Sequence, residues 1–204
     1  LEICVEGAQR NGCRMTRGEI ESLLALDIEL NAQGMGIWLD KDLEKNEQEI
    51  ETAIKVAREN YRNVIRVIVG NEAILRGDFT ASELAVYLDR VRAALTVPVS
   101  TAEPWHVWYK NPELAQHADF IAVHMLPYWE GIEIETAVDY VVNCTEALIK
   151  AFPQKQVIIA EVGWPSNGRT RRWAVASESN EATFLRRFIE RAVKEKYTYY
   201  IMEA

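Results

Sequence analysis

The chain alternates between short apolar runs and longer segments in which apolar residues recur three and four positions apart. The short runs are typical of buried strands, and the longer segments have the spacing of one helix face. The predicted strands cover six ranges: 35–39, 64–69, 97–100, 120–126, 157–162 and 197–202. A strand followed by a helix, repeated along a chain, predicts a parallel α/β architecture.

Helices are predicted between most of these strands, over 46–60, 80–95, 135–152 and 178–195. The second of them has the clearest signals. Thr80 and Glu83 have the spacing of a capping box, and Leu84 and Leu88 begin an apolar stripe. The segment 104–119 is shorter and less regular, because two prolines interrupt it.

Two parallel α/β folds fit this order, an open doubly wound sheet and a closed barrel. The pattern G-x-G-x-x-G does not follow any predicted strand, which argues against an open nucleotide-binding sheet. The acidic residues favour the barrel. Five successive strands reach a carboxylate or an imidazole, at Glu72, Glu103, His124, Glu161 and Glu203. Because the C-terminal ends of barrel strands converge on the face that holds the active site, we expect these side chains to share one site.

Aromatic residues are concentrated near the same strand ends. They are Trp38, Trp105, Trp108, Tyr128, Trp129 and Trp164. Several aromatic rings around an acidic cleft suit a pyranose sugar, because indole faces cover its C–H surface while carboxylates and amides bind its hydroxyls.

Glycoside cleavage requires two carboxyl groups, one that protonates the leaving oxygen and one that attacks the sugar or activates water. Glu72 and Glu161 are the predicted pair. The Asn71 amide can hold a sugar hydroxyl near the reacting carbon, and Trp164 can form a floor on which a ring stacks. The chemistry alone leaves open which glutamate is the acid.

Composition and charge narrow the classes of partner. The 204 residues are 49% apolar and 26% charged, as in an ordinary globular protein. A net charge of −8 argues against nucleic acid and anionic membranes as general partners. No apolar run approaches the roughly 18 residues that cross a bilayer, and no signal-peptide pattern is present. The three cysteines lack the spacing of a zinc site or a redox pair.

Two segments, "VIVGNEAILRGD" and "VIIAEVGWPSNGRT", resemble the signature segments of glycoside hydrolase family 17, the β-1,3-glucanases and glucan transglycosylases. "VPVSTAEPWHVW", "DFIAVHMLPYWEG" and "YYIMEA" resemble the bacterial members in particular. The resemblance runs from about residue 36 to the C-terminus. It implies a (β/α)₈ TIM barrel that binds β-glucan, needs no cofactor or metal ion, and acts outside the cytoplasm, in some relatives beside a membrane-bound synthase domain.

The resemblance also implies roles for individual residues. Glu72 corresponds to the general acid/base and Glu161 to the nucleophile of a retaining enzyme, so their carboxyl groups should lie roughly 5–5.5 Å apart. The residues that would line the cleft are Asn71, Glu103, Trp105, His124, Tyr128, Trp129, Trp164 and Glu203. Among them, Glu103 and Glu203 would bind hydroxyls or adjust the pKa of the catalytic pair. Trp105, Trp108 and Trp129 are candidates for acceptor subsites.

The chain departs from the family pattern at both ends. The first two strands are not recognisable within 1–35, where 17–33 is a candidate helix and 1–20 is an unplaced N-terminal segment. The C-terminus stops where relatives continue strand eight and add a helix. The expected fold is therefore one domain over 1–204, an incomplete (β/α)₈ TIM barrel. A fragment, missing segments or completion by dimerisation would each explain it.

Three functions are consistent with these residues. The first is a retaining β-1,3-glucan hydrolase or transglycosylase, in which loop shape decides whether water or a sugar hydroxyl attacks. The second is a metal-dependent barrel enzyme, whose strand-end carboxylates and imidazole would bind Mg²⁺ or Mn²⁺. The third is a partial barrel that binds glucan as a structural module without turnover. The linkage and the choice between exo and endo action stay open.

Overall fold

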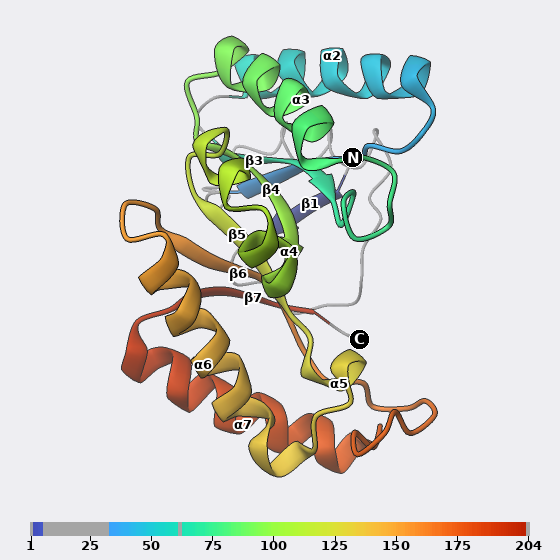
Figure 1. Cartoon of the computed structure of the whole chain (residues 1–204), viewed down its shortest axis with the longest axis vertical. Coiled ribbons are helices and arrows are strands. Elements are labelled where there is room, and N and C mark those ends of the chain that lie inside the picture. Colours follow the sequence, from blue (N-terminus) through green and yellow to red (C-terminus); the bar gives the residue numbers. More distant parts are fainter. Residues whose placement is uncertain (1, 6–32, 61–62, 203–204) are drawn as a thin grey trace. The chain divides into compact units, whose positions relative to one another are not determined.

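The computed structural model describes residues 2–5, 33–60 and 63–202, which are drawn in colour in Figure 1. The described residues form two compact units. The first runs up to Glu103 and includes Asn111–Ile121, and the second contains Pro104–Lys110 and the residues from Ala122 onward. Each unit combines parallel strands with helices, which confirms the predicted α/β class. The expectation of one domain over 1–204 stays a prediction.

The six predicted strands are confirmed as β2 to β7, and the four predicted helices as α2, α3, α6 and α7. The strands are β1 (Glu2–Val5), β2 (Gln33–Ile37), β3 (Val64–Asn71), β4 (Val99–Pro104), β5 (Ile121–Met125), β6 (Val157–Val162) and β7 (Thr198–Ile201). The helices are α2 (Leu43–Glu59), α3 (Ala81–Ala94), α4 (Trp105–Lys110), α5 (Pro127–Glu130), α6 (Ile134–Ala151) and α7 (Glu178–Glu195), with the 3₁₀ helix η1 (Pro112–Gln116).

The first unit is built on three parallel strands in the order β2, β3, β4. Met35 of β2 lies opposite Val67 of β3, which in turn lies opposite Val99 of β4. All three side chains are buried. Helices α2 and α3 accompany these strands and contact each other (Figure 1).

Strand β1 was not predicted from the sequence. It pairs antiparallel with β2, so that Cys4 lies opposite Gly34. Its four residues fall within the segment 1–20 that the sequence left unplaced. The rest of that segment, and the candidate helix over 17–33 except its last residue, lie outside the described residues.

The second unit contains the parallel strands β5, β6 and β7. Helices α6 and α7 run beside each other in this unit, as Figure 1 shows. Phe184 and Phe188, one turn apart on α7, are fully buried with their rings nearly parallel and 6.0 Å apart. Phe188 also meets Tyr199 of β7 edge to face at 5.1 Å. Aromatic side chains therefore form much of the contact between helix and strand here.

The predicted capping box at the start of α3 is present. The hydroxyl of Thr80 accepts a hydrogen bond from the backbone N–H of Glu83 at 3.2 Å, and the Glu83 carboxylate accepts one from the N–H of Thr80 at 2.8 Å. Leu84 and Leu88 of the predicted stripe are fully buried. The predicted capping box and the predicted apolar stripe thus belong to the same helix, α3.

The fold shows the predicted α/β class but not the predicted closed barrel. The described residues contain six parallel strands, three in each unit, and not a closed ring of eight. Within the described residues, none of the helices combines the length and the hydropathy that crossing a membrane requires.

Replacing Thr80 by alanine should lower the free energy of unfolding by about 1 kcal/mol, because the N–H of Glu83 loses its acceptor at the start of α3. Urea denaturation followed by circular dichroism measures this. Thr80→Ser is the matched control, since it keeps the hydroxyl and should stay close to the parent protein. Equal midpoints for Thr80→Ala and Thr80→Ser would contradict the role of the cap.

The effect of Thr80→Ala should also depend on pH. Hydrogen bonds from the backbone N–H and the hydroxyl of Thr80 hold the pKa of Glu83 below its ordinary value. A lowered pKa stabilises the folded state above the ordinary pKa of glutamate, and this stabilisation is lost as the pH falls through the lowered value. The difference between the variant and its parent should therefore shrink below about pH 4. A constant difference down to pH 3 would rule out a contribution from the hydrogen bond between the Thr80 hydroxyl and Glu83, since the alanine variant keeps the backbone N–H that also binds this carboxylate.

Candidate functional site

The first group of candidate residues lies at the turn that follows β3. Gly70 and Glu72 both have positive φ, 80° and 53°, with Asn71 between them. This backbone region costs a non-glycine residue about 1–2 kcal/mol. The N–H of Glu72 donates to the carbonyl of Ala102 on β4 at 2.8 Å, which helps to hold this conformation. The predicted acid/base is thus the residue at which the backbone leaves the strand.

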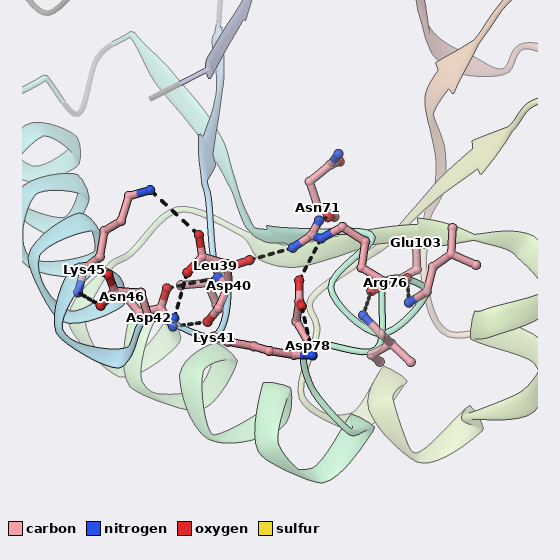
Figure 2. A network of polar contacts seen from close by, with 12 residues as sticks. Leu39, Asp40, Lys41, Asp42, Lys45, Asn46, Asn71, Arg76, Asp78 and Glu103 are labelled. Atoms are coloured by element: carbon pink, nitrogen blue, oxygen red, sulfur yellow. Dashed lines mark hydrogen bonds and ion pairs between the residues drawn. The ribbon is translucent and has the colours of Figure 1, made fainter.

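Glu103 braces this turn from β4. Its side chain is fully buried, and its two carboxylate oxygens accept hydrogen bonds from the backbone N–H groups of Ile74 at 2.7 Å and Leu75 at 3.2 Å (Figure 2). A buried carboxylate is costly unless donors of this kind compensate it. The carboxylate therefore supports the turn that carries Glu72. Direct binding of substrate by Glu103 stays a prediction.

Arg76 connects the same turn to the end of β2. Its guanidinium donates to the carbonyl of Leu39 at 2.6 Å and to the carbonyl of Asn71, and forms an ion pair with Asp78 at 2.8 Å. Figure 2 shows the guanidinium between these groups. The Arg76 side chain thereby joins the segment that follows β2 to the turn that follows β3.

The second group of candidate residues centres on Glu161 in β6. Its Oε2 atom lies 3.5 Å from Nδ1 of His124 in β5. The His124 side chain is almost completely buried, whereas 24% of the Glu161 side chain is accessible. An accessible carboxylate held by a buried imidazole can be approached by a ligand without losing its protein partner.

Gly163 follows β6 and packs against the segment after β7. A Cβ atom on Gly163 would overlap the carbonyl oxygen of Met202. The N–H of Met202 donates to the carbonyl of Val162 at 3.0 Å, which holds the two segments together. Glycine is required here for space, because its φ is not in the left-handed region.

Aromatic packing supports the loop that follows Glu161. Trp164 is 1% exposed, and its ring meets Tyr128 at 5.6 Å and Phe184 at 5.8 Å between centroids. Its indole N–H donates to the carbonyl of Val175 at 3.0 Å. Trp129, by contrast, is exposed, and the Arg171 guanidinium lies 4.0 Å from its ring centroid. Sugar binding by these aromatic residues stays a prediction.

Trp105 is held by a polar network within the second unit. Its indole N–H lies 3.2 Å from Oε1 of Glu130 and 3.0 Å from the hydroxyl of Tyr140. That hydroxyl donates to Glu130 at 2.5 Å.

Burial raises the pKa of the neighbouring Cys144 to about 11, so this thiol is protonated at neutral pH and is no nucleophile.

The prediction that Trp108 belongs to an acceptor subsite is wrong. It was a candidate for an acceptor subsite, but it is fully buried, donates its indole N–H to the carbonyl of Ala122 at 2.8 Å and packs edge to face on Phe152. The sequence placed it near a strand end, and the helix α4 turns it inward. Trp108 is a core residue.

The predicted residues thus fall in two groups. Asn71, Glu72 and Glu103 belong to the first unit, and the others within the described residues belong to the second. Glu203 lies outside the described residues. The separation of Glu72 from Glu161 stays a prediction. Among the described residues, three or more acidic, histidine or cysteine side chains do not come together in a way that could hold a metal ion.

Sequence reasoning missed three residues that organise these groups, namely Arg76, Glu130 and Tyr140. The spacing carried a signal for one of them, because Arg76 lies four residues after Glu72 on the turn that the sequence had singled out. Glu130 and Tyr140 carried none, since they look like ordinary polar positions of helices.

Residues 24–204 match the family model described as the BtgE/BtgC glycoside hydrolase domain. A similar curated protein is the putative glucan endo-1,3-beta-glucosidase btgC of Aspergillus niger, 26% identical over 94% of this chain and 31% of that protein. Another is a probable family 17 glucosidase of Saccharomyces cerevisiae, 28% identical over 80% of this chain and 43% of that protein. The chain spans about a third to a half of the length of these relatives.

Solved structures show the same likeness. The glycoside hydrolase family 17 β-1,3-glucanosyltransferase of Rhizomucor miehei matches with a TM-score of 0.75 and 31% identity, over 84% of this chain and 65% of that one. An active-site mutant of the Rhizomucor enzyme in complex with laminaritriose matches with a TM-score of 0.77 and 29% identity, over 92% of this chain and 68% of that one. The fold is therefore of the family 17 type.

The particular resemblance to bacterial members is not supported. The curated relatives with names given above, like the glucanosyltransferase, come from fungi.

Replacing Glu103 by glutamine should lower the free energy of unfolding by about 1–3 kcal/mol, because the amide group cannot accept one of the two backbone hydrogen bonds and leaves a buried donor unpaired. Urea denaturation measures this. Glu113→Gln, at an exposed position of η1, is the matched control and should be neutral. Indistinguishable midpoints for the two variants would show that Glu103 does not brace the turn.

Proposed function

The chain belongs to the BtgE/BtgC glycoside hydrolase domain family, which its residues 24–204 match, and from this membership we propose that it acts on β-1,3-glucan as a retaining hydrolase or transglycosylase. The observation that carries the proposal is the likeness, over 92% of the chain, to a β-1,3-glucanosyltransferase solved in complex with laminaritriose. A neutral oligosaccharide also agrees with the net charge of −8, which disfavours polyanionic substrates.

Glu161 is the proposed nucleophile. Its carboxylate attacks the anomeric carbon as the glycosidic C–O bond breaks, and the product is a covalent glycosyl-enzyme. The contact with His124, 3.5 Å from Oε2, supports this role because the imidazole can orient the carboxylate and donate to it when Nδ1 carries a proton. The accessible fraction of Glu161 leaves room for the sugar.

Glu72 is the proposed general acid/base. It gives its proton to the leaving oxygen in the first step, and in the second it takes a proton from the attacking water or sugar hydroxyl. Its positive φ of 53° supports this role, since strained backbone at a strand end is maintained only where the surroundings enforce it. Asn71, immediately before it, is proposed to bind a sugar hydroxyl.

The remaining predicted residues are proposed to line the cleft around this pair. Trp129 and Trp105 offer ring surface to sugars, and Trp164 supports Tyr128 from the interior. Whether water or a sugar hydroxyl is the acceptor depends on the loops that carry these aromatics. A larger share of sugar acceptor would make the enzyme a transglycosylase, and its products would be longer than the substrate.

Incubating the protein with laminari-oligosaccharides should give shorter or longer glucans by mass spectrometry. Glu72→Gln should lower the rate about 10²–10⁴-fold, the usual contribution of a general acid. Glu161→Gln should remove turnover, and Glu190→Gln, at an exposed position of α7, is the matched control that should keep it. Full activity of Glu161→Gln would refute the assignment. Glucan binding without turnover in every variant would indicate a binding module instead.

Azide can separate the roles of the two glutamates, with nitrophenyl β-laminaribioside as a substrate whose leaving group needs no proton. In Glu72→Ala, azide should attack the glycosyl-enzyme and give the β-glycosyl azide. In Glu161→Ala, azide should occupy the space left by the carboxylate and give the α-glycosyl azide. The opposite stereochemistry, read by NMR, would mean that the two roles are exchanged.

A further inference from the structure

Trp38 is a large aromatic side chain that remains accessible beside the turn of the first unit. It follows β2 directly, and 42% of its surface is exposed. A single exposed aromatic residue is ordinary on a protein surface. What distinguishes Trp38 is that the Arg76 guanidinium covers its ring and that hydrogen bonds hold the loop that follows it.

The guanidinium of Arg76 fixes one face of the ring. Its central carbon lies 4.3 Å from the centroid of the Trp38 ring, within the range of a cation–π contact. Arg76 is itself immobilised by the carbonyls of Leu39 and Asn71 and by Asp78. The side chain that covers the ring is therefore part of the framework.

Asp40 lies two residues after Trp38 in the same loop. Its carboxylate accepts a hydrogen bond from the backbone N–H of Asp42 at 2.8 Å, and this bond, together with the charges of Lys45 and Arg76, holds its pKa below the ordinary value. The hydrogen bond of Asp42 is the largest of these effects. This hydrogen bond helps to order the loop that follows the indole.

Helix α2 fixes the segment that carries these groups. The buried side chain of Asn46 accepts from the N–H of Asp40 at 3.0 Å and donates to the carbonyl of Asp40 at 2.6 Å. The oxygen and the nitrogen of the Asn46 side-chain amide thus both bind the backbone of Asp40, as Figure 2 shows. The loop that presents Trp38 is ordered before any ligand arrives.

We propose that Trp38 is a sugar-binding platform of the glucan site, and that Arg76 is the positioning residue that presents it. The inference rests on the proposed function. With one face covered by Arg76, the accessible surface offers the flat apolar contact that the C–H face of a pyranose requires, while Asp40 and Lys41 beside it can bind hydroxyls. A preorganised ring binds without losing side-chain entropy on association.

The same arginine connects the platform to the proposed chemistry. The carbonyl of Asn71 that accepts from Arg76 belongs to the residue before Glu72. A sugar stacked on Trp38 is therefore held on the framework that also holds the acid/base. The platform residues and Glu72 all lie in the first unit.

Glu161→Gln provides the background for the test, because it allows binding to be measured without turnover. Isothermal titration calorimetry with laminari-oligosaccharides of increasing length gives Kd for each variant. Trp38→Ala should raise Kd about tenfold, equivalent to roughly 1.4 kcal/mol. Trp38→Phe should raise it only about threefold, because the ring keeps a face and loses its N–H. Tyr109→Ala, at an exposed aromatic position of α4, is the matched control and should leave Kd unchanged.

A double-mutant cycle tests the role of Arg76. Arg76→Lys should weaken binding in the presence of Trp38, because an ammonium cannot bind both carbonyls as a planar fork can. It should have little further effect when Trp38 is already alanine. Additive losses in the double variant would show that Arg76 does not act through the ring.

Two results would overturn the inference in different ways. Equal Kd values for Trp38→Ala and its parent, with a lower unfolding midpoint, would make Trp38 a packing residue while leaving the proposed function intact. Failure of the Glu161→Gln background itself to bind any laminari-oligosaccharide, with folding verified by circular dichroism, would overturn the proposed function and the platform together.

Discussion

The buried carboxylate of Glu103 is the interaction on which the first unit depends. A charge without solvent is tolerated only when donors surround it, and the donors are backbone N–H groups of the turn after Glu72. The turn therefore cannot move away from β4 without leaving that charge unpaired. Arg76 extends the same constraint to the segment after β2. Three consecutive strand ends are tied together by two side chains that need not touch a substrate.

The second unit achieves the same rigidity with different forces. Glu161 has a buried imidazole beside it, and the loop that follows is supported by the rings of Trp164, Tyr128 and Phe184. Ring packing is less directional than hydrogen bonding to a carboxylate, and it excludes water more completely. The two proposed catalytic carboxyl groups therefore have unlike surroundings, a turn braced by hydrogen bonds for Glu72 and an imidazole with packed aromatic rings for Glu161.

Six strands and four helices could be predicted because their signals are local. The capping box of Thr80 and the apolar run before Glu161 depend on neighbours in the sequence. The orientation of individual side chains could not be predicted in this way. Glu103 and Trp108 lie near strand ends as expected, yet both are buried, since their direction is set by partners such as Ile74 and Phe152 that are distant in sequence. The support of Trp38 by Arg76 was hidden for the same reason.

Because of the contact between Gly163 and Met202, the residue that is tolerated at position 163 depends on the backbone path of the segment after β7. The carbonyl of Met202 occupies the position that any side chain at 163 would need. Glycine is therefore obligatory only while the chain after β7 keeps its present path. A homologue with a different path there could accept alanine or serine at this position, and the two segments should be expected to covary across the family. Transferring only one of the two segments into a related protein would therefore bring in only one partner of this contact.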